Sequence, residues 1–246
     1  RLRNVINKNL TEEDILKGCT LAFSGAWERV KLYFMIGLPT ETEEDLIGIA
    51  DLSAKVVDKY YEIPRDKKPR PVTVVASSSC FVPKPFTPFQ WDAQDTYQQF
   101  SEKARLVKSH ISRKQIKYNY HDAKLSSLEG VMARGDRRVS AAIFKAWEKG
   151  CRFDSWSELF LFDKWMEAFE ESGVDPAFYA NRKRSFDEIL PWDHISIGVT
   201  KEFLVNERKK AEMAITTPNC REKCSNCGAA SFGGGVCFES REKNKI

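Results

Sequence analysis

The order of helix signals and apolar runs in the first half of this chain constrains its fold more than any other feature. Thr11 and Thr42 are each followed by three acidic residues, the pattern of a helix N-cap with a charged first turn. Residues 30–37 form an apolar run of strand length, typical of a strand covered on both faces, and residues 72–77 are predicted to form another strand. Helices that alternate with such strands predict an α/β fold with right-handed crossovers and a parallel sheet or barrel.

The spacing of apolar residues places the remaining elements. One helix should run from Thr11 to the Gly25–Ala26 pair, and another should follow Thr42. Further helices are predicted over residues 92–110, 139–149, 156–172 and 201–213, with a short strand over 116–120. An aromatic stripe at helical spacing is more typical of a core than of a substrate platform, and this interpretation covers Phe144, Trp147, Trp156, Phe160, Trp165 and Phe169.

Four cysteines lie close together near the end of the chain. Cys220, Cys224, Cys227 and Cys237 have the spacing Cys-x3-Cys-x2-Cys-x9-Cys, which suits zinc or an iron–sulfur cluster. Disulfides or free thiols are the alternative, but the sequence shows no secretory signal and no long apolar segment. We therefore expect a cytoplasmic protein without a membrane segment, in which clustered cysteines bind a metal. The isolated cysteines are expected to be small buried side chains: Cys19, Cys80 and Cys151.

Composition sets modest bounds on function. The chain has 246 residues, 42% of them hydrophobic, which is enough for a core. Its 39 basic and 35 acidic residues are too balanced to indicate nucleic-acid binding by charge alone. Basic clusters occur at residues 65–70, 134–138 and 182–184, and a solvated loop or helix face is the favoured interpretation of each. The cluster at 134–138 could instead bind a phosphate or carboxylate.

Two unusual loops follow the first two predicted strands. Residues 37–42 read GLPTET, and residues 81–89 read FVPKPFTPF. In parallel α/β folds, ligands bind at the carboxyl ends of the strands, where both loops would lie. Proline stiffens a loop and glycine permits close approach of a backbone, so a cofactor loop and a rigid strand-to-helix turn remain equally good interpretations.

The same segments carry a resemblance to a known family. Residues 29–46 (RVKLYFMIGLPTETEEDL) resemble the fifth strand and following loop of radical S-adenosylmethionine (SAM) enzymes, of the type that includes the methylthiotransferases. Residues 81–91 (FVPKPFTPFQW) resemble the loop after the sixth strand, and residues 1–15 resemble the segment after the fourth. With residues 121–139 and 190–199, the sequence is most similar to radical SAM proteins of unassigned activity that often carry an N-terminal cobalamin-binding-like domain.

The resemblance implies an architecture and a set of cofactor contacts. It implies an α/β chain with the C-terminal half of a partial (β/α)6 barrel at residues 1–122, a helical extension at 123–212 and a Cys-rich tail at 213–246. SAM would contact Gly37, Pro39 and Glu41 after the first strand, with Phe81 and Val82 beside its adenine. Residues Arg1 and Arg3 would lie near its ribose and carboxylate.

The resemblance also implies what this chain does not contain. Radical SAM enzymes reductively cleave SAM at a 4Fe–4S cluster, whose Cys-x3-Cys-x2-Cys loop follows the first barrel strand. We therefore expect an N-terminal half or companion chain to supply that loop, and a reductant such as flavodoxin or ferredoxin to supply the electron. Cobalamin would belong to an N-terminal domain. This chain is not expected to be active alone.

The terminal cysteines are interpreted as a second site. Asn226 stands where the radical SAM loop usually has an aromatic residue, and a fourth cysteine would close the site. An auxiliary 4Fe–4S cluster or a structural zinc remains open for these residues. An unknown substrate, RNA or a small anion, would be modified by the enzyme. The alternative function is a non-catalytic, zinc-stabilised module that binds protein or RNA.

Overall fold

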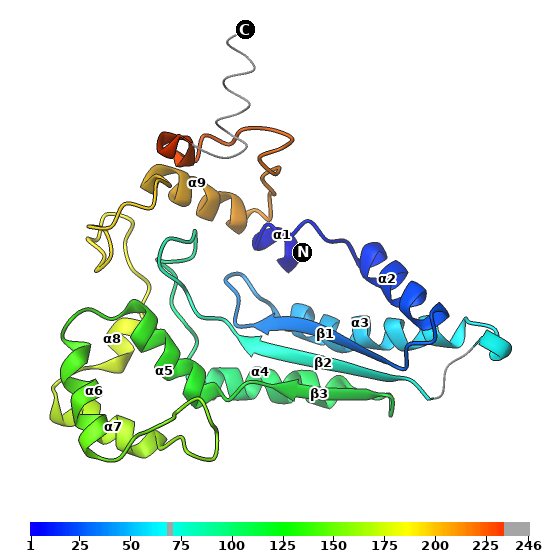
Figure 1. The fold of residues 1–246 in the computed structure, drawn as a ribbon, viewed down its shortest axis with the longest axis horizontal. Helices are drawn as coiled ribbons and strands as arrows, with labels where there is room; N and C mark the ends of the chain where they lie inside the picture. Colours follow the sequence, from blue (N-terminus) through cyan, green and yellow to red (C-terminus); the bar gives the residue numbers. More distant parts are fainter. Residues whose placement is uncertain (68–70, 234–246) are drawn as a thin grey trace, which may run out of the picture.

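A three-stranded parallel sheet forms the centre of the first half of the chain (Figure 1). The structure is a computed structural model that describes residues 1–67 and 71–233. The strands are β1 (Arg29–Ile36), β2 (Thr73–Cys80) and β3 (Ile116–Tyr120), in the order β1-β2-β3. Both pairs are parallel, with Arg29 opposite Thr73 and Val74 opposite Ile116. The predicted α/β class is confirmed.

Helices connect the strands and form the second half of the chain. No helix in the described ranges has the length and apolar character needed to cross a bilayer. The helices are α1 (Leu2–Val5), α2 (Glu12–Ser24), α3 (Glu43–Tyr61), α4 (Tyr97–His110), α5 (Ala123–Arg134), α6 (Val139–Glu148), α7 (Phe162–Glu171), α8 (Pro176–Ala180) and α9 (Lys201–Glu212), with short 3-10 turns η1 (Arg65–Lys67) and η2 (Ala229–Phe232).

The predicted helix starts at Thr11 and Thr42 are confirmed in atomic detail. The Thr11 hydroxyl accepts a hydrogen bond from the Asp14 backbone N–H, and the Asp14 carboxylate accepts one from the Thr11 backbone. Thr42 and Asp45 form the same reciprocal capping box. Each box satisfies backbone donors that have no partner within the helix, which is why four residues are enough to define the start.

Three predicted boundaries were wrong. The helix predicted over 92–110 begins at Tyr97, where Thr96 and Gln99 form a capping box, and the preceding residues belong to the loop after β2. The helix predicted over 156–172 begins at Phe162 and follows a series of turns. The strand predicted over 72–77 continues to Cys80 because β1 pairs with it along its whole length.

The two faces of the sheet differ in composition. Val30, Leu32 and Phe34 of β1 point toward the apolar cluster formed with α2 and α3. The alternate residues of β1 point the other way, and Tyr33 is 75% exposed. On β2 the same open face carries Ser77 and Ser79 rather than large apolar side chains. The prediction that β1 is covered on both faces is therefore wrong for the described residues.

The helices of the second half have their own core, which includes Trp165 and Phe169 as predicted. Phe144, Trp147 and Trp156, which were also assigned to the core, are exposed, and Trp147 is 54% exposed. Phe144 and Trp147 stack on each other at 5.9 Å between ring centroids. Helical spacing therefore identified a shared face of α6, but that face lies on the surface.

Candidate functional site

A cleft lies at the carboxyl end of the sheet, where the sequence placed the functional loops. Its volume is about 440 Å3, within the range typical of small-molecule sites. The strands and the loops that follow them supply most of the wall, and Ile6, the residue just after α1, also contributes. The other lining residues are Met35, Leu38, Ser79, Cys80, Phe81, Val82, Lys84, Thr87, Phe89, His121, Ser126 and Glu129.

The loop after β1 is closed by its own glutamate. The Gly37 backbone N–H donates to both Glu41 oxygens, at 3.0 and 2.9 Å, and Lys103 lies 2.8 Å from the same carboxylate. The Glu41 side chain is only 2% exposed. Burial raises the pKa of Glu41, although Lys103 and the backbone donors partly offset this effect. Glu41 thus shapes the loop from inside, while its neighbour Leu38 lines the cleft.

Position 37 requires glycine for two reasons: its surroundings leave no room for a Cβ, and its backbone has a positive φ. A Cβ at this position would lie 2.4 Å from the Phe100 ring and 2.9 Å from an Asp95 oxygen. Its φ of +83° also falls in the region that favours glycine. Pro39 is half-buried in the same loop, and Leu38 is buried. Local folding alone thus accounts for the glycine that the resemblance associates with SAM.

Helix α1 lies against this loop. Arg1 donates to the Thr40 hydroxyl at 3.0 Å and to the Thr40 carbonyl at 2.6 Å, and it also pairs with Asp45. Thr40 has a φ of +67°, a strained conformation for a β-branched residue, and these bonds help to hold it. Arg3 is partly buried on α1 and has no side-chain hydrogen bond among the described residues. Figure 1 shows α1 beside α9, beyond the ends of the strands.

The loop after β2 supplies the apolar wall. Phe81 continues the strand by donating its N–H to the Ile36 carbonyl at 2.9 Å, and its ring meets Phe89 edge to face. Val82 follows on the cleft surface. At the rim, Lys84 forms an ion pair with Glu129. The structure thus brings together Phe81, Val82 and the loop that contains Gly37, Pro39 and Glu41.

Cys80 and His121 also line the cleft. Burial raises the pKa of the Cys80 thiol to about 11, so this residue is a neutral thiol at physiological pH. Cys19, Cys80 and Cys151 are all buried, as predicted. His121 lies just after β3 and lines the cleft, and its backbone N–H donates to the Ser78 carbonyl at 3.0 Å.

Distant residues that the sequence analysis did not identify anchor the loop after β2. Arg208 on α9 forms a buried two-point ion pair with Asp92, at 2.7 and 2.8 Å. The Trp192 indole N–H donates to the Gln90 side chain at 2.6 Å. Both interactions join positions more than 100 residues apart. No local signal in the sequence marks such partners.

Part of the predicted metal site folds as a turn attached to α9. Asn226 and Gly228 have φ values of +55° and +97°, which turn the backbone tightly around Cys227. The Thr200 N–H donates to the Cys227 carbonyl at 2.9 Å, and a Cβ at Gly228 would lie 2.6 Å from the Gly198 carbonyl oxygen. Cys224 is exposed and contacts the Asn226 side chain at 3.6 Å.

The metal itself stays a prediction. Within the part of the chain that the structure describes, no group of three or more potential ligands is arranged to hold a metal ion. Cys220 and Cys224 are exposed and Cys227 is half-buried, while Cys237 lies outside the described residues. The tight turn at 224–228 suits two thiolates on one ion.

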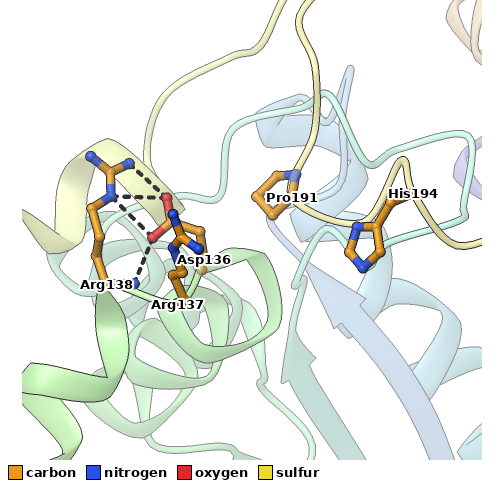
Figure 2. Close-up of a pocket in the computed structure, with 6 residues that line it drawn as sticks. Asp136, Arg137, Arg138, Pro191 and His194 are labelled. Carbon is orange, nitrogen blue, oxygen red and sulfur yellow. Dashed lines mark hydrogen bonds and ion pairs between the residues drawn. The ribbon is translucent and has the colours of Figure 1, made fainter.

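A second cleft, of about 560 Å3, lies between the α5–α6 turn and residues 191–194 (Figure 2). Arg137 and Arg138 line one side, and Pro191 and His194 line the other. Arg138 holds the Asp136 carboxylate through its side chain and its backbone N–H, and these bonds lower the pKa of Asp136 to about 2.

The interpretation of residues 134–138 and 182–184 as solvated clusters was partly wrong. Arg134 is 0% exposed and Arg184 is 3% exposed. Arg134 donates to the carbonyls of Asp92 and Ala180, at 2.6 and 3.0 Å, and Arg184 donates to the Arg134 carbonyl at 3.0 Å. Converging backbone carbonyls thus bind these guanidinium groups inside the protein.

Part of the chain is similar in sequence to an archaeal protein of unassigned activity. The uncharacterized protein MJ0966 of Methanocaldococcus jannaschii is 30% identical over 140 residues, which is 57% of this chain and 29% of that protein. This chain therefore spans less than a third of the relative's length. No protein-family model matches the chain. No solved structure matches it.

Proposed function

We propose that this chain forms the SAM-facing, C-terminal half of a partial (β/α)6 barrel in a radical SAM enzyme that modifies an unknown substrate. The main support is the cleft at the carboxyl end of the sheet. Three segments singled out by the resemblance meet there: the loop after β1 through Leu38, the loop after β2 through Phe81 and Val82, and the N-terminal segment through Ile6. Parallel strands carry their ligands at this edge.

The residues of the cleft fit the roles that the proposal gives them. Phe81, Val82 and Leu38 form an apolar wall that would pack against the adenine ring. Gly37 and Glu41 hydrogen-bond to each other within the loop, so they position this wall rather than form hydrogen bonds with the ligand. When bound beside its cluster, SAM supplies a radical that abstracts hydrogen from a substrate.

The edge of β1 suits the completion of a barrel. Among the described strands, β1 pairs only with β2, and its other edge is unpaired. Earlier strands of a barrel, from the same protein or a companion chain, would pair with this edge and supply the radical SAM cluster loop. The serines on the open face of β2 would then face the interior of that barrel.

The first experiment distinguishes metal bound by the C-terminal cysteines from metal bound elsewhere in the complete protein. The complete protein that contains this chain would be purified without oxygen, and iron, sulfide and zinc would be measured beside a variant with serine at positions 220, 224, 227 and 237. About eight iron and eight sulfide per protein, halved in the variant, would support a radical SAM cluster plus an auxiliary cluster. Iron that is absent from both proteins would contradict the enzyme proposal.

A second measurement tests the cleft directly. Phe81→Ala shortens the proposed adenine wall, whereas Phe178→Ala removes an exposed aromatic ring from α8, remote in sequence from the cleft. We expect Phe81→Ala to weaken SAM binding by the anaerobic complete protein about tenfold or more, because the lost ring is worth about 1–3 kcal/mol of stacking. Equal SAM binding by the wild type and Phe81→Ala would rule out this placement of SAM.

The attachment of the cysteine turn to α9 supports a second candidate function, a zinc-stabilised binding module. The Thr200–Cys227 hydrogen bond and the close packing of Gly228 make this turn a folded part of the protein. Under this alternative, the complete protein would contain zinc without iron and would not bind SAM. Cys224→Ser would then unfold the tail alone, which circular dichroism and limited proteolysis would detect.

A further inference from the structure

The residues that line the cleft shown in Figure 2 adjoin several arginines. Of the arginines around it, Arg138 pairs with Asp136, Arg182 with Glu188 and Arg208 with Asp92. Among the described residues, Arg134, Arg137 and Arg184 have no carboxylate within ion-pair distance; two of these are buried and Arg137 is exposed. The 191–194 segment also carries the exposed carboxylate of Asp193, which accepts a hydrogen bond from the Leu190 N–H, so the three arginines without an ion pair outnumber it.

The Arg184 guanidinium contacts a residue next to each of the two walls of the cleft. Its Nη2 donates to the Arg134 carbonyl at 3.0 Å, and Arg134 immediately precedes the lining residue Gly135. Its Cζ lies 5.2 Å from the centroid of the Trp192 ring, and Trp192 immediately follows the lining residue Pro191. The positive charge thus lies beside residues that adjoin both walls of the cleft.

Backbone carbonyls satisfy these buried arginines only in part. The Nε of Arg134 and both Nε and Nη1 of Arg184 have no hydrogen-bond partner among the described residues. Burial, followed by the charges of Arg184 and Arg182, lowers the pKa of Arg134 to about 10, so it remains a cation at neutral pH. A buried cation without a counterion is costly, and an anion in the neighbouring cleft would offset that cost.

From this arrangement we infer that the cleft between the α5–α6 turn and residues 191–194 binds a phosphoryl group. Figure 2 shows Arg137 and His194 on opposite sides of the cleft, where both could donate to the phosphoryl oxygens. Arg184 and Arg134 do not line the cleft but add buried positive charge beside the residues that do. A phosphate carries close to two negative charges at neutral pH, which suits this excess better than the single charge of a carboxylate. The terminal phosphate of a nucleotide carries such a charge, whereas each backbone phosphate of RNA carries one, so a nucleotide is the proposed ligand and RNA is an alternative outcome of the test.

Calorimetry on the complete protein that contains this chain tests this inference with three probes: inorganic phosphate, adenosine monophosphate and an octamer of uridine ribonucleotides. The test variant is Arg137→Gln, because Arg137 is exposed and its side chain forms no hydrogen bond or ion pair among the described residues that the fold would lose. The matched control is Arg105→Gln, an exposed arginine on α4 far along the chain from the cleft. Thermal unfolding of both variants should equal that of the wild type.

We expect Arg137→Gln to bind phosphate about tenfold more weakly, the usual loss for one charged hydrogen bond, and Arg105→Gln to bind as the wild type does. His194→Gln should also weaken binding. Tighter binding of the monophosphate than of phosphate would identify a nucleotide, and tighter, salt-dependent binding of the octamer would identify RNA. The inference fails if no probe binds, or if the two arginine variants lose affinity equally.

Discussion

The loops after β1 and β2 leave neighbouring parallel strands at the same edge of the sheet, but different parts of the chain hold them in place. The loop after β1 is closed from within, because Glu41 accepts hydrogen bonds from Gly37 four residues earlier. The loop after β2 is held by Trp192 and Arg208, which lie 102 and 116 residues beyond their partners. One wall of the cleft is therefore a local structure, and the other depends on the fold of the whole chain.

The largest expected effect comes from removing a distant anchor. Arg208→Met leaves the Asp92 carboxylate buried without its counterion, so we expect the free energy of unfolding to fall by about 3–5 kcal/mol. Urea unfolding followed by circular dichroism measures this change. The matched control is Arg113→Met, which breaks an exposed ion pair with Asp58 and should cost less than about 1 kcal/mol. Similar losses in both variants would refute the special role of the buried pair.

The local loop should be sensitive to a single methyl group. Gly37→Ala places a Cβ against Phe100 and forces alanine into a positive φ, so we expect a loss of about 2–3 kcal/mol. Gly48→Ala is the control, because Gly48 lies within α3 with open space around it and alanine favours helices there by about 1 kcal/mol. A neutral Gly37→Ala variant would mean that this loop repacks freely.

A smaller effect tests whether the Trp192–Gln90 hydrogen bond and the Arg208–Asp92 ion pair hold the loop after β2 independently. Trp192→Phe keeps most of the buried ring but removes the N–H that donates to Gln90. We expect a loss of about 1–2 kcal/mol, because one buried hydrogen bond is lost while the Asp92–Arg208 pair remains. Thermal unfolding would measure it. A loss as large as that of Arg208→Met would instead show that α9 and the 191–194 segment detach together.

The smallest effect concerns pH and the local loop. Burial raises the pKa of Glu41 above its usual 4.5, so the folded protein holds this proton more firmly than the unfolded chain does. Protonated Glu41 therefore favours folding at low pH, and this contribution is lost as pH rises above 4.5. Glu41→Gln removes the titration, so its stability relative to the wild type should improve as pH rises through that range. Parallel pH profiles from urea unfolding would contradict this assignment.

The contrast between the loops also explains what the sequence could predict. The helix starts at Thr11 and Thr42 were predictable because each capping box uses residues only three positions apart. The meeting of Leu38, Phe81 and Val82 follows from parallel strand order, which places successive loops at one edge. These features need only local patterns and one topological rule.

Other features depend on partners that a local pattern does not reveal. Residues 92–95 were assigned to a helix, but Gln94 instead donates its backbone N–H to the Ala180 carbonyl in a distant segment. Arg134 and Arg184 were expected in solvent because of their charge, yet carbonyls brought together by the tertiary fold bury them. The exposed face of Trp147 had the same spacing as a core face, since periodicity does not show which surface a helix presents.

The bonds of Arg134 have a practical consequence for redesigning this protein. Its guanidinium binds the backbone carbonyls of Asp92, Ala180 and Arg182, a group that every amino acid carries. These bonds tie α5 to the loop after β2 and to the end of α8, so they specify where three segments run but not which side chains they bear. Position 182, which is half-buried, could thus carry a reporter group while the scaffold keeps its path, whereas Ala180 is buried in the core and leaves no room for one. A change at 134, by contrast, would release all three segments together.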